Sequence, residues 1–253
     1  MKSKLLILSD ISGFTDCTWI KTYVDALNPY FHLTFYDSCE LAGINRINVS
    51  KEEVHSQFIN HGIDIAANKL KELETKEVRI LAFSIGGTIA WKAGLKSLHI
   101  NTLYAISSTR LRKEVKNPLC EIHLYYAEKD PFIPKDIWFE SMSVEAEIIQ
   151  NKQHKMYKTE AVAHRICMQI IKQNILEKIC YTERVYDRIN KKLSSSYSHK
   201  EIESFILAIL QKTDSVFFTK TGKNYYVRNE TNNIRITINS NTLRVITVDK
   251  MTK

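Results

Sequence analysis

The chain has 253 residues, 44% hydrophobic and 25% charged, a balance typical of a globular protein. Five scattered cysteines without a CxxC pair indicate neither a disulfide framework nor a zinc knuckle, and they favour a reducing compartment. The apolar run at residues 5–8 is too short for a signal peptide or a membrane span. We therefore expect a cytoplasmic protein with no membrane partner.

The net charge of +8 is spread unevenly along the chain. Residues 1–172 hold 22 basic and 20 acidic side chains, whereas residues 173–253 hold 14 and 8. An excess of positive charge either serves solubility or attracts an anionic partner. Because the basic side chains in residues 173–253 form no dense Lys/Arg block, the pattern favours the interpretation that they serve solubility.

Residues 1–172 alternate apolar runs with helical patterns. Helical patterns cover 18–27, 50–74 and 86–94, and Ser50 and Glu53 form a capping-box signature at the second of them. The apolar runs cover 4–9, 31–37, 78–84, 102–107, 121–127 and 145–150. Nearly continuous apolar runs separated by helices predict a doubly wound, mainly parallel α/β sheet of about six strands. Ligands of such sheets bind at the carboxyl ends of the strands.

The third run leads into Ala82-Phe83-Ser84-Ile85-Gly86, between a strand and a helix. This matches the nucleophile-elbow pattern small-x-Ser-x-Gly, in which a sharp turn holds the serine hydroxyl above the sheet. Small residues are needed two positions before and two positions after the serine, because larger side chains there would clash with neighbouring backbone. The N–H of Ile85 would then face a developing oxyanion.

A nucleophilic serine needs a base and an acid that orients it, here expected in the order Ser, acid, His. Asp130 follows the fifth run and precedes a proline, with Glu128 as the alternative acid. His154 follows the sixth run, where the general base belongs. The competitor His164 lies inside a helical pattern at 159–173, which is typical of a packed or surface histidine.

With these residues, the segment 1–172 resembles a compact, cap-less α/β-hydrolase of the esterase and dienelactone-hydrolase-like kind. The resemblance implies an oxyanion hole with a second N–H from the loop after the first strand, where Ser9-Asp10 replaces the usual His-Gly pair. Ile11 is the first candidate for this donor and Ser12 the second. The fold's first antiparallel strands and a lid insertion are expected to be missing.

Further pocket candidates follow other strand ends. Asp10, expected near the mouth of the site, could repel anionic substrates or hold a substrate hydroxyl or amine, or it could bind its own backbone. Ser12 and Ser38 lie after the first two runs, and Ser108 and Arg110 lie after the fourth. Arg110 could clamp a carboxylate or form a surface salt bridge.

The remaining residues, 173–253, predict a separate small α+β domain of two helices and an antiparallel meander. A charged helix is expected at 175–193, and Ser198 with Glu201 caps the second helix. The strands are expected at 216–219, 224–228, 234–238 and 243–248, joined by turns at 221–223, 230–233 and 239–241. The strings "ICYTERVYDRINKKL", "KTGKNYYVRN" and "NIRITINSNTLRVITVD" resemble a small bacterial domain of unknown function.

The strands of this domain carry basic and aromatic side chains, namely Lys223, Arg228, Arg235, Arg244, Tyr225 and Tyr226. Such a sheet can bind single-stranded nucleic acid. The alternation at 234–238 favours another interpretation, with isoleucines facing inward and Arg and Thr in solvent.

The sequence therefore predicts a serine hydrolase that cleaves a small ester, thioester or amide through an acyl-enzyme, without metal or cofactor. The alternative hypothesis is an inactive hydrolase fold that binds nucleic acid or another anionic partner through its basic C-terminal domain. The oligomeric state is open in both cases.

Overall fold

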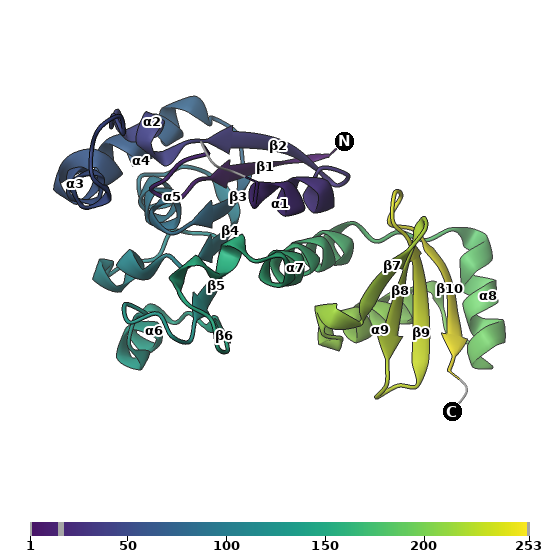
Figure 1. Ribbon diagram of the computed structural model, residues 1–253. Helices are drawn as coiled ribbons and strands as arrows, with labels where there is room; N and C mark the ends of the chain where they lie inside the picture. Colours follow the sequence, from purple (N-terminus) through teal and green to yellow (C-terminus); the bar gives the residue numbers. More distant parts are fainter. Residues whose placement is uncertain (1, 15–17, 252–253) are drawn as a thin grey trace. The chain divides into compact units, whose positions relative to one another are not determined.

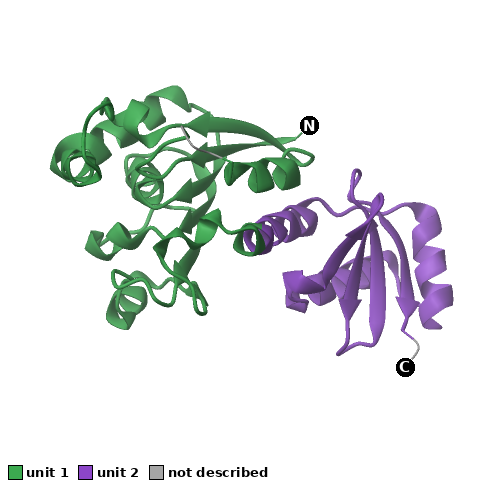
Figure 2. Cartoon of the chain, in the orientation of Figure 1, with its two compact units in different colours: residues 1–163 green, residues 164–253 purple. Residues whose placement is uncertain are grey.

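The computed structural model describes residues 2–14 and 18–251, and the chain divides into two compact units (Figure 2). Unit 1 covers residues 1–163 and unit 2 covers residues 164–253. The boundary lies inside helix α7 (Glu160–Lys178), whereas the sequence predicts a boundary at residue 172.

Unit 1 is built on a six-stranded, fully parallel sheet with the order β2-β1-β3-β4-β5-β6 (Figure 1). The strands are β1 (Ser3–Leu8), β2 (Phe31–Tyr36), β3 (Val78–Phe83), β4 (Ile100–Ile106), β5 (Glu121–Ala127) and β6 (Ala146–Ile149). Every residue of β3 is buried, because the strand is central and both faces of the sheet are covered. The predicted doubly wound α/β architecture is confirmed.

Helices cover both faces of this sheet. One face forms a continuous core with α2 (Ser38–Ala42), α3 (Lys51–Gln57), α4 (Ile63–Leu73), α5 (Ile85–Leu95) and α6 (Asp136–Met142). On the other face, α1 (Ile20–Leu27) brings Tyr23 against Phe83 at the end of β3. The helices on the two faces of the sheet therefore both pack near the carboxyl end of the central strand, β3.

The predicted helix at 50–74 is continuous but not uniform. Its middle turn, Phe58–Gly62, is a π-helix between α3 and α4. Ser50 accepts the Glu53 N–H at 3.2 Å, which is the first half of the expected capping box. The short helices α2 and α6 were not foreseen from the sequence, because neither is long enough to display a helical period.

Unit 2 contains the antiparallel meander β10-β9-β8-β7, as predicted. Its strands are β7 (Phe218–Thr221), β8 (Asn224–Asn229), β9 (Ile234–Asn239) and β10 (Val245–Lys250), and the 3-10 helix η4 (Ser215–Phe217) precedes them. Two helices accompany the sheet, α8 (Glu183–Leu193) and α9 (His199–Lys212). The capping box of Ser198 and Glu201 at the start of α9 is complete. The turn at Gly222, with φ +56°, joins β7 and β8.

The single helix expected at 175–193 is wrong, because α7 ends at Lys178 and α8 begins at Glu183. Between them Cys180 forms a bridge with Arg244: its N–H donates to Leu243 and its carbonyl accepts the Val245 N–H. These contacts with a distant strand require extended backbone at Cys180, and they interrupt the helical pattern.

The burial pattern of β9 agrees with the predicted alternation except at one position. Ile234, Ile236 and Ile238 are buried and Arg235 is partly exposed, but Thr237 is only 5% exposed. No helix among the described residues is long and apolar enough to span a membrane. The four described cysteines are free thiols, and Cys17 lies outside the described residues.

Candidate active site

Ser84 occupies a strained turn between β3 and α5. Its φ of 52° and ψ of −114° lie outside the regions that residues with a Cβ normally adopt. The turn is held in place because the Ser84 N–H donates to the Ile106 carbonyl at the end of β4, at 2.8 Å. Strain of this kind is maintained only where surrounding structure imposes it, and it clusters at functional sites.

The two glycines after Ser84 remove side chains that would have no room. A Cβ on Gly86 would lie 2.6 Å from the Ser9 carbonyl oxygen, a backbone atom that cannot move aside. A Cβ on Gly87 would lie 1.9 Å from Ser108 Oγ and 3.1 Å from Ala105 Cβ of β4. Gly86 thus lets the first turn of α5 touch the loop after β1, and Gly87 lets it touch the end of β4.

The structure brings the serine, the histidine and the aspartate together. Ser84 Oγ lies 3.0 Å from His154 Nε2, and His154 Nδ1 lies 2.5 Å from Asp130 Oδ2. The Asp130 side chain is fully buried, whereas that of His154 is 36% exposed and Ser84 is partly exposed. With Nδ1–H donating to the carboxylate, Nε2 is left to accept the serine proton.

Main-chain contacts fix the acid and the histidine relative to each other. Asp130 Oδ1 accepts the Phe132 N–H at 3.0 Å, so the carboxylate also closes the tight loop after β5. The Lys129 N–H donates to the Lys152 carbonyl at 2.9 Å and ties this loop to the one that precedes His154. His154 itself opens the 3-10 helix η3 (His154–Lys158).

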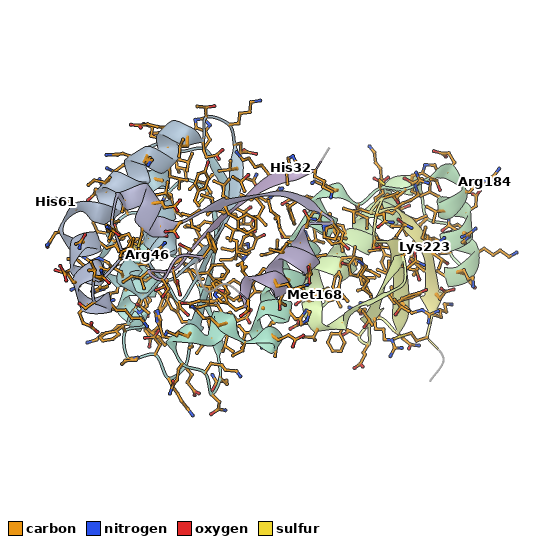
Figure 3. All side chains as sticks on the ribbon, turned by 45° about the horizontal axis from the view of Figure 1, so that its top comes forward. His32, Arg46, His61, Met168, Arg184 and Lys223 are labelled. Atoms are coloured by element: carbon orange, nitrogen blue, oxygen red, sulfur yellow. The ribbon has the colours of Figure 1, made fainter. Side chains whose placement is uncertain are left out.

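The alternative acid and the alternative base have other surroundings. Glu128 accepts the Asn151 N–H at 2.8 Å and so fastens the histidine loop instead of the imidazole. His164 lies in α7, as its helical pattern predicted. His32 and His61, for which the sequence suggested no role, are exposed (Figure 3).

The two residues expected as candidates for the second oxyanion donor, Ile11 and Ser12, differ in what the structure shows of their N–H groups. The Ser12 N–H is engaged, because it donates to Asp10 Oδ1 at 2.9 Å. Ile11 lies in the same loop, whose first residue, Ser9, touches Gly86 in the first turn of α5. Ile85 is the first residue of α5, where N–H groups have no acceptor within the helix.

Asp10 does not line the mouth of the site as one expectation had it, because it is 2% exposed. Besides the Ser12 N–H, its carboxylate accepts the Tyr157 hydroxyl at 2.8 Å and the Lys158 ammonium at 3.0 Å. Burial and the neighbouring Asp10 carboxylate raise the pKa of Tyr157 above its usual range, so the phenol stays a donor. Asp10 thus joins the loop after β1 to the turn that begins with His154.

Two other pocket candidates are also buried. Ser38 is 0% exposed and donates its hydroxyl to the Ser9 carbonyl at 2.6 Å. Ser108 is 0% exposed and packs against Gly87. The Ser38 hydroxyl thus joins the ends of β1 and β2, whereas the Ser108 hydroxyl donates to the Ile106 carbonyl of its own strand at 3.4 Å. Arg110, by contrast, is half-buried in the 3-10 helix η2 (Thr109–Lys113).

Aromatic residues beside the site were missed from the sequence. The ring of Tyr157 lies 5.2 Å from that of Phe83 and 5.4 Å from that of Trp19. Lys158 lies 5.0 Å from the Trp19 ring centroid. Spacing within the sequence gave no signal for this cluster, because its members come from three separate segments.

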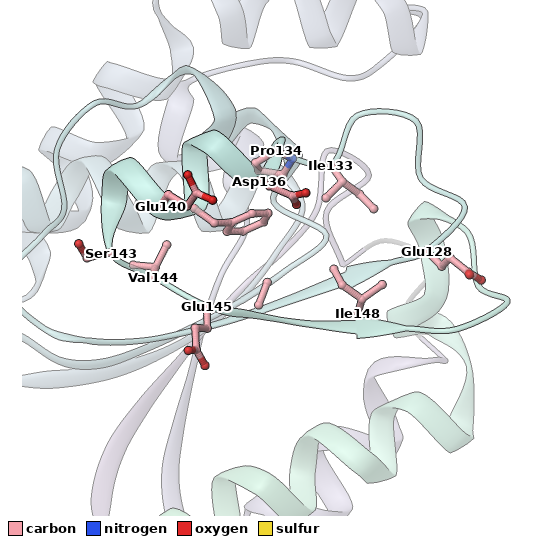
Figure 4. A pocket seen from close by; sticks show the side chains of 11 residues that line it. Glu128, Ile133, Pro134, Asp136, Glu140, Ser143, Val144, Glu145 and Ile148 are labelled. Atoms are coloured by element: carbon pink, nitrogen blue, oxygen red, sulfur yellow. The ribbon is translucent and has the colours of Figure 1, made fainter.

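A large pocket, of about 860 Å³, lies away from Ser84 between α6 and the edge strand β6 (Figure 4). Asp136 and Glu140 line it from α6, and Glu145 and Ile148 line it from β6 or the residue just before. None of Ser84, Asp130 and His154 belongs to its lining. Its volume is therefore not evidence about the chemistry at Ser84.

Comparisons with known proteins address the two units separately. Residues 173–249 match a family model described as a protein of unknown function, DUF3781. A search of curated protein sequences finds no significant match to the chain.

Solved structures resemble about two thirds of the chain. A predicted CIB-like hydrolase from Thermoplasma acidophilum is 17% identical, with a TM-score of 0.50 over 67% of this chain and 86% of that one. An α/β hydrolase enzyme from the metagenome of sediments of the Mar Chica lagoon, Morocco, is 13% identical, with a TM-score of 0.50 over 68% and 92%. At such identities the likeness concerns the fold alone. The chain thus combines an α/β-hydrolase fold with a C-terminal segment that matches the DUF3781 family.

Proposed function

We propose that unit 1 is a serine hydrolase that cleaves an ester, thioester or amide through an acyl-enzyme on Ser84. His154 Nε2 takes the proton of the Ser84 hydroxyl while the oxygen attacks the acyl carbonyl. Asp130 holds the imidazole by its Nδ1–H and stabilises the positive charge that forms. His154 then returns the proton to the leaving group, and later activates the water that releases the acyl group from Ser84.

The attack places a negative charge on the former carbonyl oxygen. The N–H of Ile85 and the N–H of Ile11 are the donors proposed for this oxyanion. Donors fixed in advance by a helix start and a bonded loop need no reorganisation when the charge develops. The contact between Gly86 and Ser9 supports this assignment, because it keeps the two donor segments adjacent.

One observation carries the proposal, namely the continuous hydrogen-bonded series from Ser84 through His154 to Asp130. The reaction requires a nucleophile and a base that the substrate can reach, and Ser84 and His154 are both partly exposed. It also requires an acid shielded from water, and the Asp130 side chain is buried. The strained backbone at Ser84 adds support.

A fluorophosphonate probe tests the proposal, because it phosphonylates only an activated serine. We expect the wild type to be labelled and Ser84→Ala not to be labelled. Ser97→Ala is a matched control, since Ser97 also has a positive φ, of 73°, but follows helix α5. An unlabelled wild type, or equal labelling of Ser84→Ala, would refute the proposal.

A second candidate function, binding of an anionic polymer by unit 2, is favoured by one feature of its sheet. Arg228 and Arg235 stand directly opposite each other on β8 and β9, an arrangement that is unfavourable unless negative charge lies nearby. Asp249 supplies part of that charge, at 3.8 Å from Arg235. Tyr225 is buried, so of the two predicted aromatics Tyr226 is the one left partly exposed.

Titration of the full chain with single-stranded RNA tests this second candidate. Binding through these arginines should weaken as salt is added, and it should weaken further in Arg228→Gln. Binding that is absent, or that does not respond to salt, would eliminate it.

A further inference from the structure

The loops that carry the acid and the base of unit 1 are unusually basic. β4, β5 and β6 are followed by residues 107–113, 128–135 and 150–158, the first of which is the part of the β4–β5 connection up to the end of η2. Together they hold eight basic and two acidic side chains, a net charge of +6. Residues 1–163 as a whole hold 20 basic and 20 acidic side chains, so the rest of the unit carries a net charge of −6. The positive charge of a neutral unit is thus concentrated on three loops.

Most of these basic side chains have no ion-pair partner among the described residues. Lys158 pairs with the buried Asp10, but the other seven basic side chains make no ion pair in the part of the chain that the structure describes. One of the two acids, Asp130, is buried against His154. On the opposite half of the carboxyl edge, Asp37 is neutralised by Arg46 at 2.8 Å (Figure 3).

The three loops form one continuous rim. The Lys129 N–H donates to the Lys152 carbonyl, which joins the second loop to the third. The Arg112 guanidinium lies 5.4 Å from the ring centroid of Phe132, which joins the first loop to the second. Because neighbouring strands lie roughly 5 Å apart, the loops begin within about 15 Å of the end of β3, where Ser84 stands. At low ionic strength, where the screening length reaches about 30 Å, charges at this range influence a ligand near Ser84.

We propose that the substrate of the Ser84 site is an acyl compound that carries a carboxylate or phosphate group. This proposal rests on the proposed serine hydrolase. Concentrated positive charge attracts an anionic substrate and raises the rate at which it reaches the site. Arg110 is the strongest candidate for a direct contact, because the residue is half-buried and has no ion-pair partner among the described residues. Its guanidinium can bind either anion in a bidentate way.

Three acidic side chains lie outside these loops, and one of them, Glu145, stands at the amino end of β6. Asp136, Glu140 and Glu145 line the pocket beside β6, on the outer edge of the sheet (Figure 4). Glu128 stands between the two regions, with one oxygen engaged by the Asn151 N–H.

Two esters with the same number of acyl carbons test the proposal. One is the neutral 4-nitrophenyl pentanoate, and the other is the 4-nitrophenyl monoester of glutaric acid, which carries a carboxylate. At low salt we expect kcat/KM for the anionic ester to exceed that for the neutral ester by about tenfold or more. Added salt should reduce this ratio, since it screens the attraction. The 4-nitrophenyl ester of 4-phosphonobutanoic acid then distinguishes phosphate-like from carboxylate recognition.

A variant that removes positive charge from the three loops tests whether they cause the preference for the anionic ester. Arg110→Gln, Lys129→Gln and Lys155→Gln together should bring the ratio of the two esters close to one. The control variant Lys51→Gln, Lys71→Gln and Lys76→Gln removes the same charge from exposed sites on other segments and should keep the wild-type ratio.

The outcomes separate this proposal from the proposed function. Cleavage of the neutral ester with no preference for the anionic ones, or an equal loss of preference in both variants, would overturn the anionic substrate while leaving the serine hydrolase in place. Failure of the wild type to cleave any ester or to react with the fluorophosphonate would overturn both.

Discussion

Units 1 and 2 both pack helices on one sheet, yet they use polar side chains differently. In unit 2 some polar contacts are local, as in the capping box of Ser198 and Glu201, and others join two elements, as Asn229 Nδ2 does when it donates to Thr213 Oγ1 at 2.8 Å. In unit 1 polar side chains join distant strand ends, as Ser84 and Asp130 do through His154. Local contacts define elements, whereas contacts between strand ends assemble groups that can react together.

Positive φ values occur in both units, and what differs is the role of the one at Ser84. In unit 2 the positive φ at Gly222 and Asn233 serves tight turns. In unit 1 the positive φ at Ser84 aims a hydroxyl at an imidazole. The variants below use paired substitutions in the two units to challenge this contrast, beginning with the largest expected effect.

Replacing the base should abolish turnover. We expect His154→Ala to lower kcat by about 10⁴-fold, because the nucleophile then has no proton acceptor. His164→Ala, which changes the same residue type in α7 of unit 2, should lower kcat by less than about threefold. Steady-state hydrolysis of 4-nitrophenyl esters measures both, and the opposite ranking would contradict the assignment of the base.

Two glycine substitutions compare the reasons for glycine in each unit. Gly86→Ala should destabilise unit 1 by about 2 kcal/mol or more and reduce labelling of Ser84, because its Cβ would meet backbone at 2.6 Å. Gly222→Ala should destabilise unit 2 by about 1 kcal/mol, since the space is open and only the positive φ is unfavourable. Chemical denaturation and probe labelling check both. Normal stability and labelling in Gly86→Ala would show that the turn tolerates a side chain.

Loss of the Asp10 carboxylate should affect catalysis more than stability. Asp10→Asn weakens the connection to Tyr157 and Lys158, so the turn that begins with His154 should shift and kcat should fall about tenfold to a hundredfold with little change in KM. If Asp10 acts on catalysis through Tyr157, the double variant Asp10→Asn with Tyr157→Phe should have nearly the same kcat as Asp10→Asn alone. Fully additive losses would assign the two residues separate roles.

A cap in unit 2 gives the smallest effect. Ser198→Ala removes the acceptor of the Glu201 N–H and should lower the free energy of unfolding by about 1 kcal/mol. Ester hydrolysis should stay at the wild-type rate. A marked loss of activity would show that unit 2 contributes to the chemistry, and the contrast drawn above would fail.

The sequence predicted those parts of the fold and site that depend on one position along the chain. The runs that became β1 to β6, the glycines after Ser84, and the positions of Asp130 and His154 after their strands could all be predicted, because each has its own local pattern. The partners of Asp10 could not, since Tyr157 and Lys158 approach it only in the folded chain. The burial of Ser38 and Ser108 and the break at Cys180 depend on the same kind of distant contact.

The central claim is a covalent acyl group on Ser84, and a hindered ester tests it most directly. With 4-nitrophenyl trimethylacetate, whose acyl-enzyme hydrolyses slowly, we expect a burst of one 4-nitrophenol per chain. Mass spectrometry should then place the trimethylacetyl group on the peptide that contains Ser84. Absence of both the burst and the adduct, or an acyl group on another residue, would contradict the account.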